Sequence, residues 1–198
     1  MGTKNRYDYL PLKVKENNSK VIIEIGTWKA RNAIKMINES LSANKPEDVY
    51  YYGFDLFEEM DQKTYEYEHS KWPPNLSTVE KELKKTGANI KLVKGNTLKT
   101  LPEFVNGFNQ VPDLIYIDGG HSIDTIENDW RHLSSIVGEK TVVIFDDYYV
   151  MKDGKEPTKG CKQTIDSLDR SEWNVELLED FDTFGDRCIY FVEVKKGG

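Results

Sequence analysis

The chain has 198 residues, with 27 Lys and Arg against 34 Asp and Glu and a formal charge of −7 at pH 7. Its length is that of a single domain over residues 1–198, and 38% hydrophobic residues suffice for a core. The acidic balance argues against a nucleic-acid or membrane partner, and no apolar run is long enough for a membrane span. The first residues are too polar for a secretion signal, and two cysteines are too few for a disulfide framework. We therefore expect a soluble, cytoplasmic protein.

Short apolar runs alternate with stretches of helical spacing along the chain. The β-branched and aromatic runs predict strands at 21–26, 49–55, 90–93, 114–118, 141–146, 173–178 and 188–194. Helices are expected at 29–41, at 78–86, from 98 onward, at 123–137 and at 160–168. Ser77 and Glu80 form a capping box that predicts the start of the second helix, and Pro102 is expected to keep the third one short.

This alternation predicts an α/β protein with a Rossmann-like, doubly wound and mostly parallel sheet. The last two strands have no helix between them, so they are expected to form an antiparallel hairpin at one edge. Ligands bind such sheets beyond the carboxyl ends of the strands. Four predicted strands end in Gly26, Asp55, Asp118 and Asp146, so reactive residues gather at that edge.

The first strand ends in a glycine that precedes a helix, within Glu24-Ile25-Gly26-Thr27-Trp28. A glycine there permits a tight turn that brings the backbone close to a ligand. Trp28 stands at the second glycine position of the G-x-G-x-x-G pattern, which argues against NAD or FAD. Glu24 lies in an apolar strand and needs a partner, because an unpaired buried carboxylate is costly. An ordinary strand-to-helix turn is the alternative.

Acidic residues mark the ends of three later strands. Asp55 ends the second, where nucleotide-binding α/β folds place an acid that accepts hydrogen bonds from a ribose. Asp118 and Asp146 are 28 residues apart, enough for one crossover helix and the next strand, so they should meet at one edge. Clustered carboxylates repel unless they are protonated or share a cation, and Mg²⁺ prefers oxygen ligands. We expect Asp118, Asp146 and Asp147 to hold a divalent cation, with helix caps and solvated loop acids as alternatives.

His121 follows Asp118 by three residues, after two glycines. An imidazole there lies within reach of a hydroxyl held by the cation, and a neutral histidine is a suitable general base. A further metal ligand and an exposed loop residue are the alternatives. His69 and His132 have no comparable setting and are assigned no role.

Together these motifs resemble the class I S-adenosylmethionine-dependent methyltransferases, and within them the metal-dependent group that contains the macrocin O-methyltransferases. The resemblance is carried by Glu24-Ile25-Gly26-Thr27 with Arg31, Tyr52-Gly53-Phe54-Asp55, Gly95-Asn96-Thr97 with Leu101-Pro102, Ile117-Asp118-Gly119-Gly120-His121-Ser122, Phe145-Asp146-Asp147-Tyr148 and residues 160–166. The glycine turn alone is a weak motif, whereas the ordered set is specific. Three features depart from the pattern: Ala30 stands where many members have glycine, Asn96 where an acid is frequent, and only a short segment precedes the first strand.

The resemblance implies S-adenosylmethionine as cofactor, with a binding site made of Glu24, Gly26, Thr27, Trp28, Asp55, Leu56, Asn96, Thr97 and Asp118. Glu24 and Gly26 would hold its amino-acid end. Asp55 would bind the ribose, and Asn96 with Thr97 would lie near the adenine. Asp118, Asp146 and Asp147 would bind Mg²⁺ or another divalent cation, and His121 beside Asp118 would be the catalytic base. The implied reaction transfers a methyl group to a hydroxyl of a small molecule, a sugar or another vicinal diol.

Two other functions fit the same residues. A metal-dependent nucleotide-sugar transferase would need basic residues near the pyrophosphate, for which Lys29 and Arg31 are available. A non-catalytic module would bind the cofactor without turnover. The segment Leu56–Pro74 is rich in aromatics and is expected either to cover the substrate or to pack as an additional helix. The acceptor, the physiological metal and the oligomeric state, with a homodimer among the options, stay open.

Overall fold

The computed structural model describes residues 5–68 and 71–197. Its strands are β1 (Val21–Ile25), β2 (Tyr50–Asp55), β3 (Asn89–Lys94), β4 (Leu114–Ile117), β5 (Val142–Met151), β6 (Trp173–Phe184) and β7 (Arg187–Lys196). Its α-helices are α1 (Tyr9–Glu16), α2 (Arg31–Leu41), α3 (Gln62–Glu68), α4 (Leu76–Lys84), α5 (Thr97–Gly107), α6 (Ile123–Leu133) and α7 (Lys162–Asp166). Short 3₁₀ helices lie at η1 (Arg6–Asp8), η2 (Pro46–Asp48), η3 (Phe57–Glu59) and η4 (Ser134–Ile136). None of the helices in the described ranges is long and apolar enough to cross a membrane.

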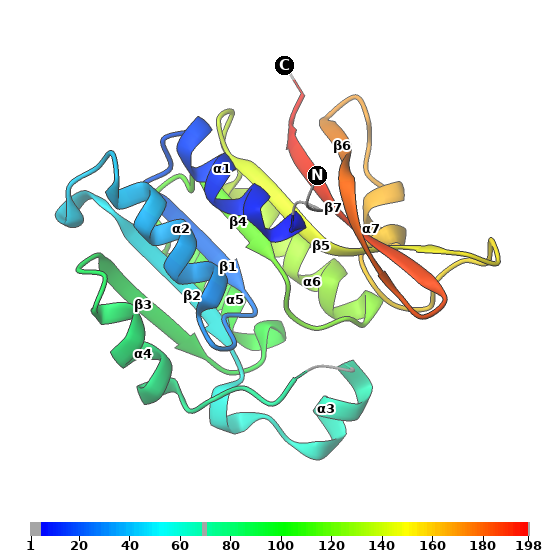
Figure 1. The fold of residues 1–198 in the computed structure, drawn as a ribbon, viewed down its shortest axis with the longest axis horizontal. Coiled ribbons are helices and arrows are strands. Elements are labelled where there is room, and N and C mark those ends of the chain that lie inside the picture. The colour runs from blue at the N-terminus through cyan, green and yellow to red at the C-terminus, as the bar shows by residue number, and fades with distance from the viewer. Residues whose placement is uncertain (1–4, 69–70, 198) are drawn as a thin grey trace.

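The strands form one sheet in the order β3-β2-β1-β4-β5-β7-β6 (Figure 1). Strands β1 to β5 run parallel, and β7 runs antiparallel to both β5 and β6. This arrangement confirms the predicted doubly wound sheet with an antiparallel hairpin at its edge. Since β1 pairs with β2 on one side and β4 on the other, the order reverses there, and ligands of such sheets bind at this reversal.

Helices cover both faces of the sheet, as the alternating sequence pattern requires. Helices α1, α2 and α4 pack on one face, through residues such as Val14, Met36 and Leu83. Helices α5, α6 and α7 pack on the other, through residues such as Leu101, Trp130 and Ile165. Helix α3 joins neither layer in Figure 1 and lies beyond the edge where β1 and β2 end.

The C-terminal strands are longer than predicted. Strand β5 does not end at Asp146 but continues to Met151, and the hairpin strands extend to meet at a tight turn around Gly185. The register of β5 against β7 shifts between Phe145 and Tyr148, and Asp147 has a φ of 62°. This bulge redirects the two acidic side chains within a continuous strand, which alternation alone would send to opposite faces.

Two predicted helix ends are wrong. Helix α4 begins at Leu76 after Asn75, so Ser77 lies inside it and does not cap it. Helix α5 runs through Pro102 to Gly107, because one missing N–H does not outweigh the burial of neighbouring Leu101 in the core.

Candidate active site

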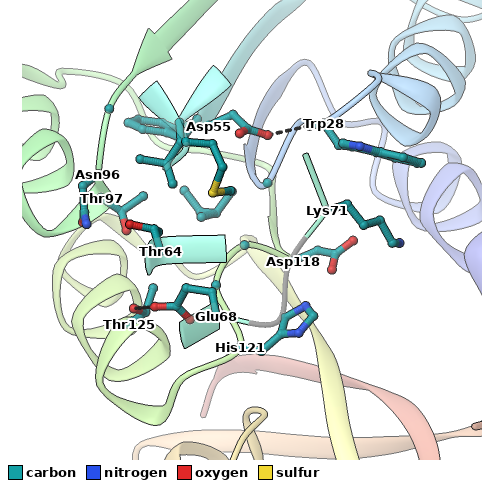
Figure 2. Close-up of a pocket in the computed structure, with 18 residues that line it drawn as sticks. Trp28, Asp55, Thr64, Glu68, Lys71, Asn96, Thr97, Asp118, His121 and Thr125 are labelled. Atoms are coloured by element: carbon teal, nitrogen blue, oxygen red, sulfur yellow. Dashed lines mark hydrogen bonds between the residues drawn. The ribbon is translucent and has the colours of Figure 1, made fainter. Parts of the chain in front are cut away.

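A pocket opens at the carboxyl ends of β1, β2 and β4, where the strand order reverses (Figure 2). Its volume of about 880 Å³, counting the solvent space at its mouth, is typical of small-molecule sites. Of the predicted site residues, the lining contains Gly26, Trp28, Asp55, Leu56, Asn96, Thr97, Asp118 and His121. It does not contain Glu24, Thr27, Asp146 or Asp147.

The turn after β1 brings backbone from three strands together. Gly26 has a φ of +93°, and a Cβ there would lie 1.8 Å from the carbonyl oxygen of Asp118. The Gly26 N–H donates to the carbonyl of Phe54 at 2.9 Å. Ala30, which stands where many members of the resembled family have glycine, has a φ of 58°, in the region that favours glycine. Only glycine fits at Gly26, and the strained Ala30 keeps the same turn.

Asp55 fixes the loops on both sides of this turn. Its Oδ2 accepts from the N–H of Trp28 at 2.7 Å, and its Oδ1 accepts from the N–H of Phe57 at 3.1 Å (Figure 2 shows the first contact). Burial raises the pKa of Asp55, and these backbone hydrogen bonds oppose the rise. The carboxylate therefore orders the pocket wall while it also lines the pocket.

Glu24 and Thr27 lie behind the pocket wall. The Tyr51 hydroxyl donates to Oε2 of Glu24, and Thr27 Oγ1 lies 3.3 Å from the same phenol oxygen. Burial raises the pKa of Glu24 to about 8, against the lowering effect of the Tyr51 hydrogen bond. Tyr51 is thus the partner that a buried Glu24 needs, and the pair supports the turn from beneath.

Asn96 and Thr97 begin α5 at the far side of the pocket from Trp28 and Lys71 (Figure 2). The Asn96 side chain caps the helix by accepting from the N–H of Leu98 at 2.9 Å. On α6, the Asn128 side-chain N–H donates to Oδ1 of the buried Asp129 at 3.4 Å. Within the described ranges, Oδ2 of this buried carboxyl has no partner, and burial raises the pKa of Asp129 to about 7.

Asp118, His121 and Asp147 meet at the pocket edge. Each offers one ligand atom, and these atoms all lie within 4.8 Å of one another. His121 Nε2 lies 3.1 Å from Asp147 Oδ2. The loop before α7 holds the backbone of both residues, since Gly160 N–H donates to the His121 carbonyl at 2.8 Å and Cys161 N–H to the Asp147 carbonyl at 3.0 Å. Two carboxylates and an imidazole form a donor set that suits a divalent cation.

The pKa of Asp118 is strongly perturbed by its surroundings. Burial raises its pKa well above the ordinary value, and the charges of Asp146 and Asp147 raise it further. The Tyr116 hydroxyl donates to Asp118 Oδ2 at 2.9 Å and opposes the rise. A cation between the carboxylates would relieve this repulsion, so the residues fit the metal that the sequence predicted.

Asp146 faces a protein cation that the sequence analysis missed. Arg6 of η1 forms a buried ion pair with Asp146 Oδ1, while the hydroxyls of Tyr7 and Tyr116 each lie 3.2 Å from Oδ2. Burial and the neighbouring Asp147 raise the pKa of Asp146 to about 6, and Arg6 opposes the rise. The structure therefore places Asp146 beside the cluster, with Arg6 as its counter-ion. A lone arginine in a polar N-terminal stretch gave no signal of this pairing.

The segment Leu56–Pro74 contains helix α3 and also borders the pocket, through Met60, Thr64, Glu68 and Lys71. Glu68 docks α3 onto the start of α6. Its carboxylate accepts from the Ser122 N–H at 2.7 Å, the Ser122 hydroxyl at 2.9 Å and the Thr125 hydroxyl at 2.8 Å. The sequence analysis missed this contact because Glu68 stands in a charged stretch without an apolar pattern. His69, which was assigned no role, lies outside the described residues.

The strand order, the glycine turn and the pocket define a class I S-adenosylmethionine-dependent methyltransferase fold. A sequence model of the family described as "Methyltransferase domain" matches residues 23–148. The chain therefore belongs to this methyltransferase family.

Solved structures agree on the fold. A candidate O-methyltransferase from Klebsiella pneumoniae is 19% identical with a TM-score of 0.69, over 98% of this chain and 81% of that one. The O-methyltransferase TomG from Streptomyces achromogenes, involved in tomaymycin synthesis and solved with S-adenosylmethionine, is 14% identical with a TM-score of 0.69, over 97% and 79%. An O-methyltransferase from Bacillus cereus, solved with S-adenosylhomocysteine, is 14% identical with a TM-score of 0.67, over 100% and 83%. No curated protein sequence matches this chain significantly.

Proposed function

We propose that this protein transfers a methyl group from S-adenosylmethionine to a hydroxyl of a small molecule, assisted by Mg²⁺ or another divalent cation. The observation that carries the proposal is the cluster of Asp118, His121 and Asp147 at the edge of a pocket that opens onto the Gly26 turn. The names of the structural neighbours, several of them O-methyltransferases, support the same reaction.

The cofactor is proposed to lie along the pocket from the Gly26 turn to the start of α5. Asp55 is held by backbone N–H groups, and its lone pairs that face the pocket suit ribose hydroxyls. Asn96 and Thr97 suit the adenine, which then lies in the part of the pocket farthest from the acidic cluster. Glu24 would act through the turn that it supports from beneath, because it does not line the pocket.

Asp118 and Asp147 are the residues that would hold the divalent cation. When bound, the cofactor supplies an electrophilic methyl carbon and the cation lowers the pKa of an acceptor hydroxyl. A vicinal diol, on a sugar or a catechol, offers two oxygens to such a site. Asp146 is occupied by Arg6, so it contributes charge nearby and does not need to be a ligand.

His121 is proposed to take the proton of the acceptor hydroxyl. His121 Nε2 lies 3.1 Å from Asp147 Oδ2, so the imidazole stands beside a proposed cation ligand and within reach of a hydroxyl held there. A positioned base of this kind contributes roughly 10²–10⁴-fold to a rate. If His121 is a ligand instead, His121→Ala would weaken metal affinity more than it lowers turnover, and this comparison separates the two roles.

Calorimetric titration tests the proposal against the nucleotide-sugar transferase and the non-catalytic module. We expect S-adenosylmethionine and S-adenosylhomocysteine to bind and a nucleotide sugar not to bind. Binding of the nucleotide sugar alone would refute the proposal. Cofactor binding without any effect of Mg²⁺, and without a methylated product across a panel of diols, would identify a non-catalytic module.

A further inference from the structure

Three cations surround one indole ring at the pocket. Lys29 Nζ lies 4.7 Å from the centre of the Trp28 ring, Lys71 Nζ lies 4.9 Å from it, and Arg31 Cζ lies 5.8 Å from it. We call Lys29, Arg31 and Lys71 the cationic rim. An indole attracts cations over its faces, but it has only two faces and its attraction to exposed cations is weak. The ring alone does not account for three cations in a chain whose net charge is −7.

The cationic rim lacks acidic partners. Across residues 5–68 and 71–197, none of its three members forms an ion pair. Other exposed lysines in these ranges, such as Lys45, are unpaired too, but here three cations lie around one ring. Asp55 and Asp118, two acids that line the pocket, interact with other groups and form no ion pair with the rim. Asp55 accepts from backbone N–H groups, and Asp118 belongs to the acidic cluster. The rim is therefore a concentration of uncompensated positive charge.

One member of the rim, Lys71, lines the pocket, whereas Lys29 and Arg31 lie outside its lining. Trp28 and Lys71 line the pocket, and Figure 2 shows Lys71 beside Trp28 and on the same side as Asp118 and His121. The Trp28 N–H donates to Asp55, and its Nε1–H donates to the carbonyl of Trp72 at 3.2 Å. The indole thus links the turn after β1 to the segment after α3. An anion held by Lys71 would lie at the pocket, toward the proposed reaction centre, with Lys29 and Arg31 adding positive charge from outside the lining.

We propose that the cationic rim binds an anionic group of the methyl acceptor, so that the substrate is a small diol that carries a carboxylate, phosphate or sulfate. This inference rests on the proposed function and names its substrate class. S-adenosylmethionine is a poor candidate for the same positive field, because its sulfonium and ammonium outnumber its carboxylate. The rim therefore attracts an anionic acceptor and opposes the cofactor, and the two roles predict opposite effects of removing a charge.

A pair of probes of nearly the same shape, one anionic and one neutral, tests the inference. The probes are 3,4-dihydroxybenzoate and 3,4-dihydroxybenzamide, titrated by calorimetry into the protein loaded with S-adenosylhomocysteine and Mg²⁺. We expect the benzoate to bind about 10-fold more tightly than the amide. The preference should fall toward 1 in Lys71→Met and in Lys29→Met, and rising salt should weaken it. Lys71→Arg, which keeps the charge, should retain the preference. The control is Lys45→Met, because Lys45 is exposed before β2, at the opposite edge of the sheet.

Each outcome decides the inference. Cofactor affinity should be unchanged or tighter in Lys71→Met. A weaker affinity for S-adenosylmethionine would show that the rim holds the cofactor's own carboxylate, and it would overturn the inference. Equal binding of the two probes, or no binding of the benzoate to protein that binds S-adenosylmethionine, would overturn it too while leaving the proposed function standing. Failure of the wild-type protein to bind S-adenosylmethionine would overturn the proposed function and the inference with it.

Discussion

Asp129 offers a quantitative test of the structure around the pocket. Its side chain is fully buried between α6 and α5, and burial raises its pKa from 3.8 to about 7. An unfolded chain loses this proton near pH 4 and the folded chain only near pH 7, so the folded state binds the extra proton between them. Stability therefore falls as the pH rises through that window. At 1.36 kcal/mol for each pKa unit, the full effect is about 4 kcal/mol.

The substitution Asp129→Asn removes the charge and keeps the shape. Since the new amide must satisfy its own hydrogen bonds, the net gain at pH 8.5 should be about 1–3 kcal/mol over the wild type. At pH 5 the wild-type carboxyl is mostly protonated in the folded state, so the gain should shrink or reverse. Urea unfolding at both pH values measures the difference, with Glu127→Gln as the exposed control on the same helix. A variant that is less stable than the wild type by the same amount at both pH values would refute this reasoning.

Three further predictions concern the pocket and the residues that support it. Asp55→Ala should raise the dissociation constant of S-adenosylmethionine about 10–100-fold, because one carboxylate orders two loops, and an unaltered constant would remove Asp55 from the site. Arg6→Met should lower the free energy of unfolding by about 3–5 kcal/mol at pH 8, since it leaves the buried Asp146 without its counter-ion. The exposed Lys35→Met is the control, and an equally small loss in both variants would show that the Arg6–Asp146 pair is not formed. Glu68→Gln should speed hydrogen exchange of the α3 amides about 10-fold or more, because its amide cannot accept all three hydrogen bonds. Equal exchange rates in Glu68→Gln and in the exposed control Glu66→Gln would contradict the docking contact.

Local patterns in the sequence were sufficient to predict the sheet. Buried β-branched runs such as Val21–Ile25 are continuous because both faces of a parallel strand are covered. The ends of elements were predicted less well, since they depend on neighbours that local pattern does not show. The extension of β5 past Asp146 depends on its pairing with β7, and the start of α4 at Leu76 overrides the capping box at Ser77.

For the site too, residues placed by the local pattern were predictable and their distant partners were not. Strand-end residues such as Asp55 and Asp118 could be predicted, because parallel strands bring their carboxyl ends to one edge. The partners that come from elsewhere could not be predicted. Arg6 reaches Asp146 across 140 positions, and Glu68 reaches Ser122 across 54. Contacts of such separation leave no periodic trace in the sequence, and they determine which acids are free to bind a cation.

The central claim is that acids from two neighbouring strands assist methyl transfer beside the cofactor. The most direct test is mass spectrometry of a diol panel, including 3,4-dihydroxybenzoate, incubated with S-adenosylmethionine, Mg²⁺ and either the wild-type protein or Asp147→Asn. We predict a product heavier by one methylene unit with the wild type. We also predict a loss of about 100-fold or more with Asp147→Asn or with a chelator, while cofactor binding by calorimetry stays within a few-fold. Turnover that is as fast in Asp147→Asn and in the chelated wild type as in the untreated wild type would contradict the claim.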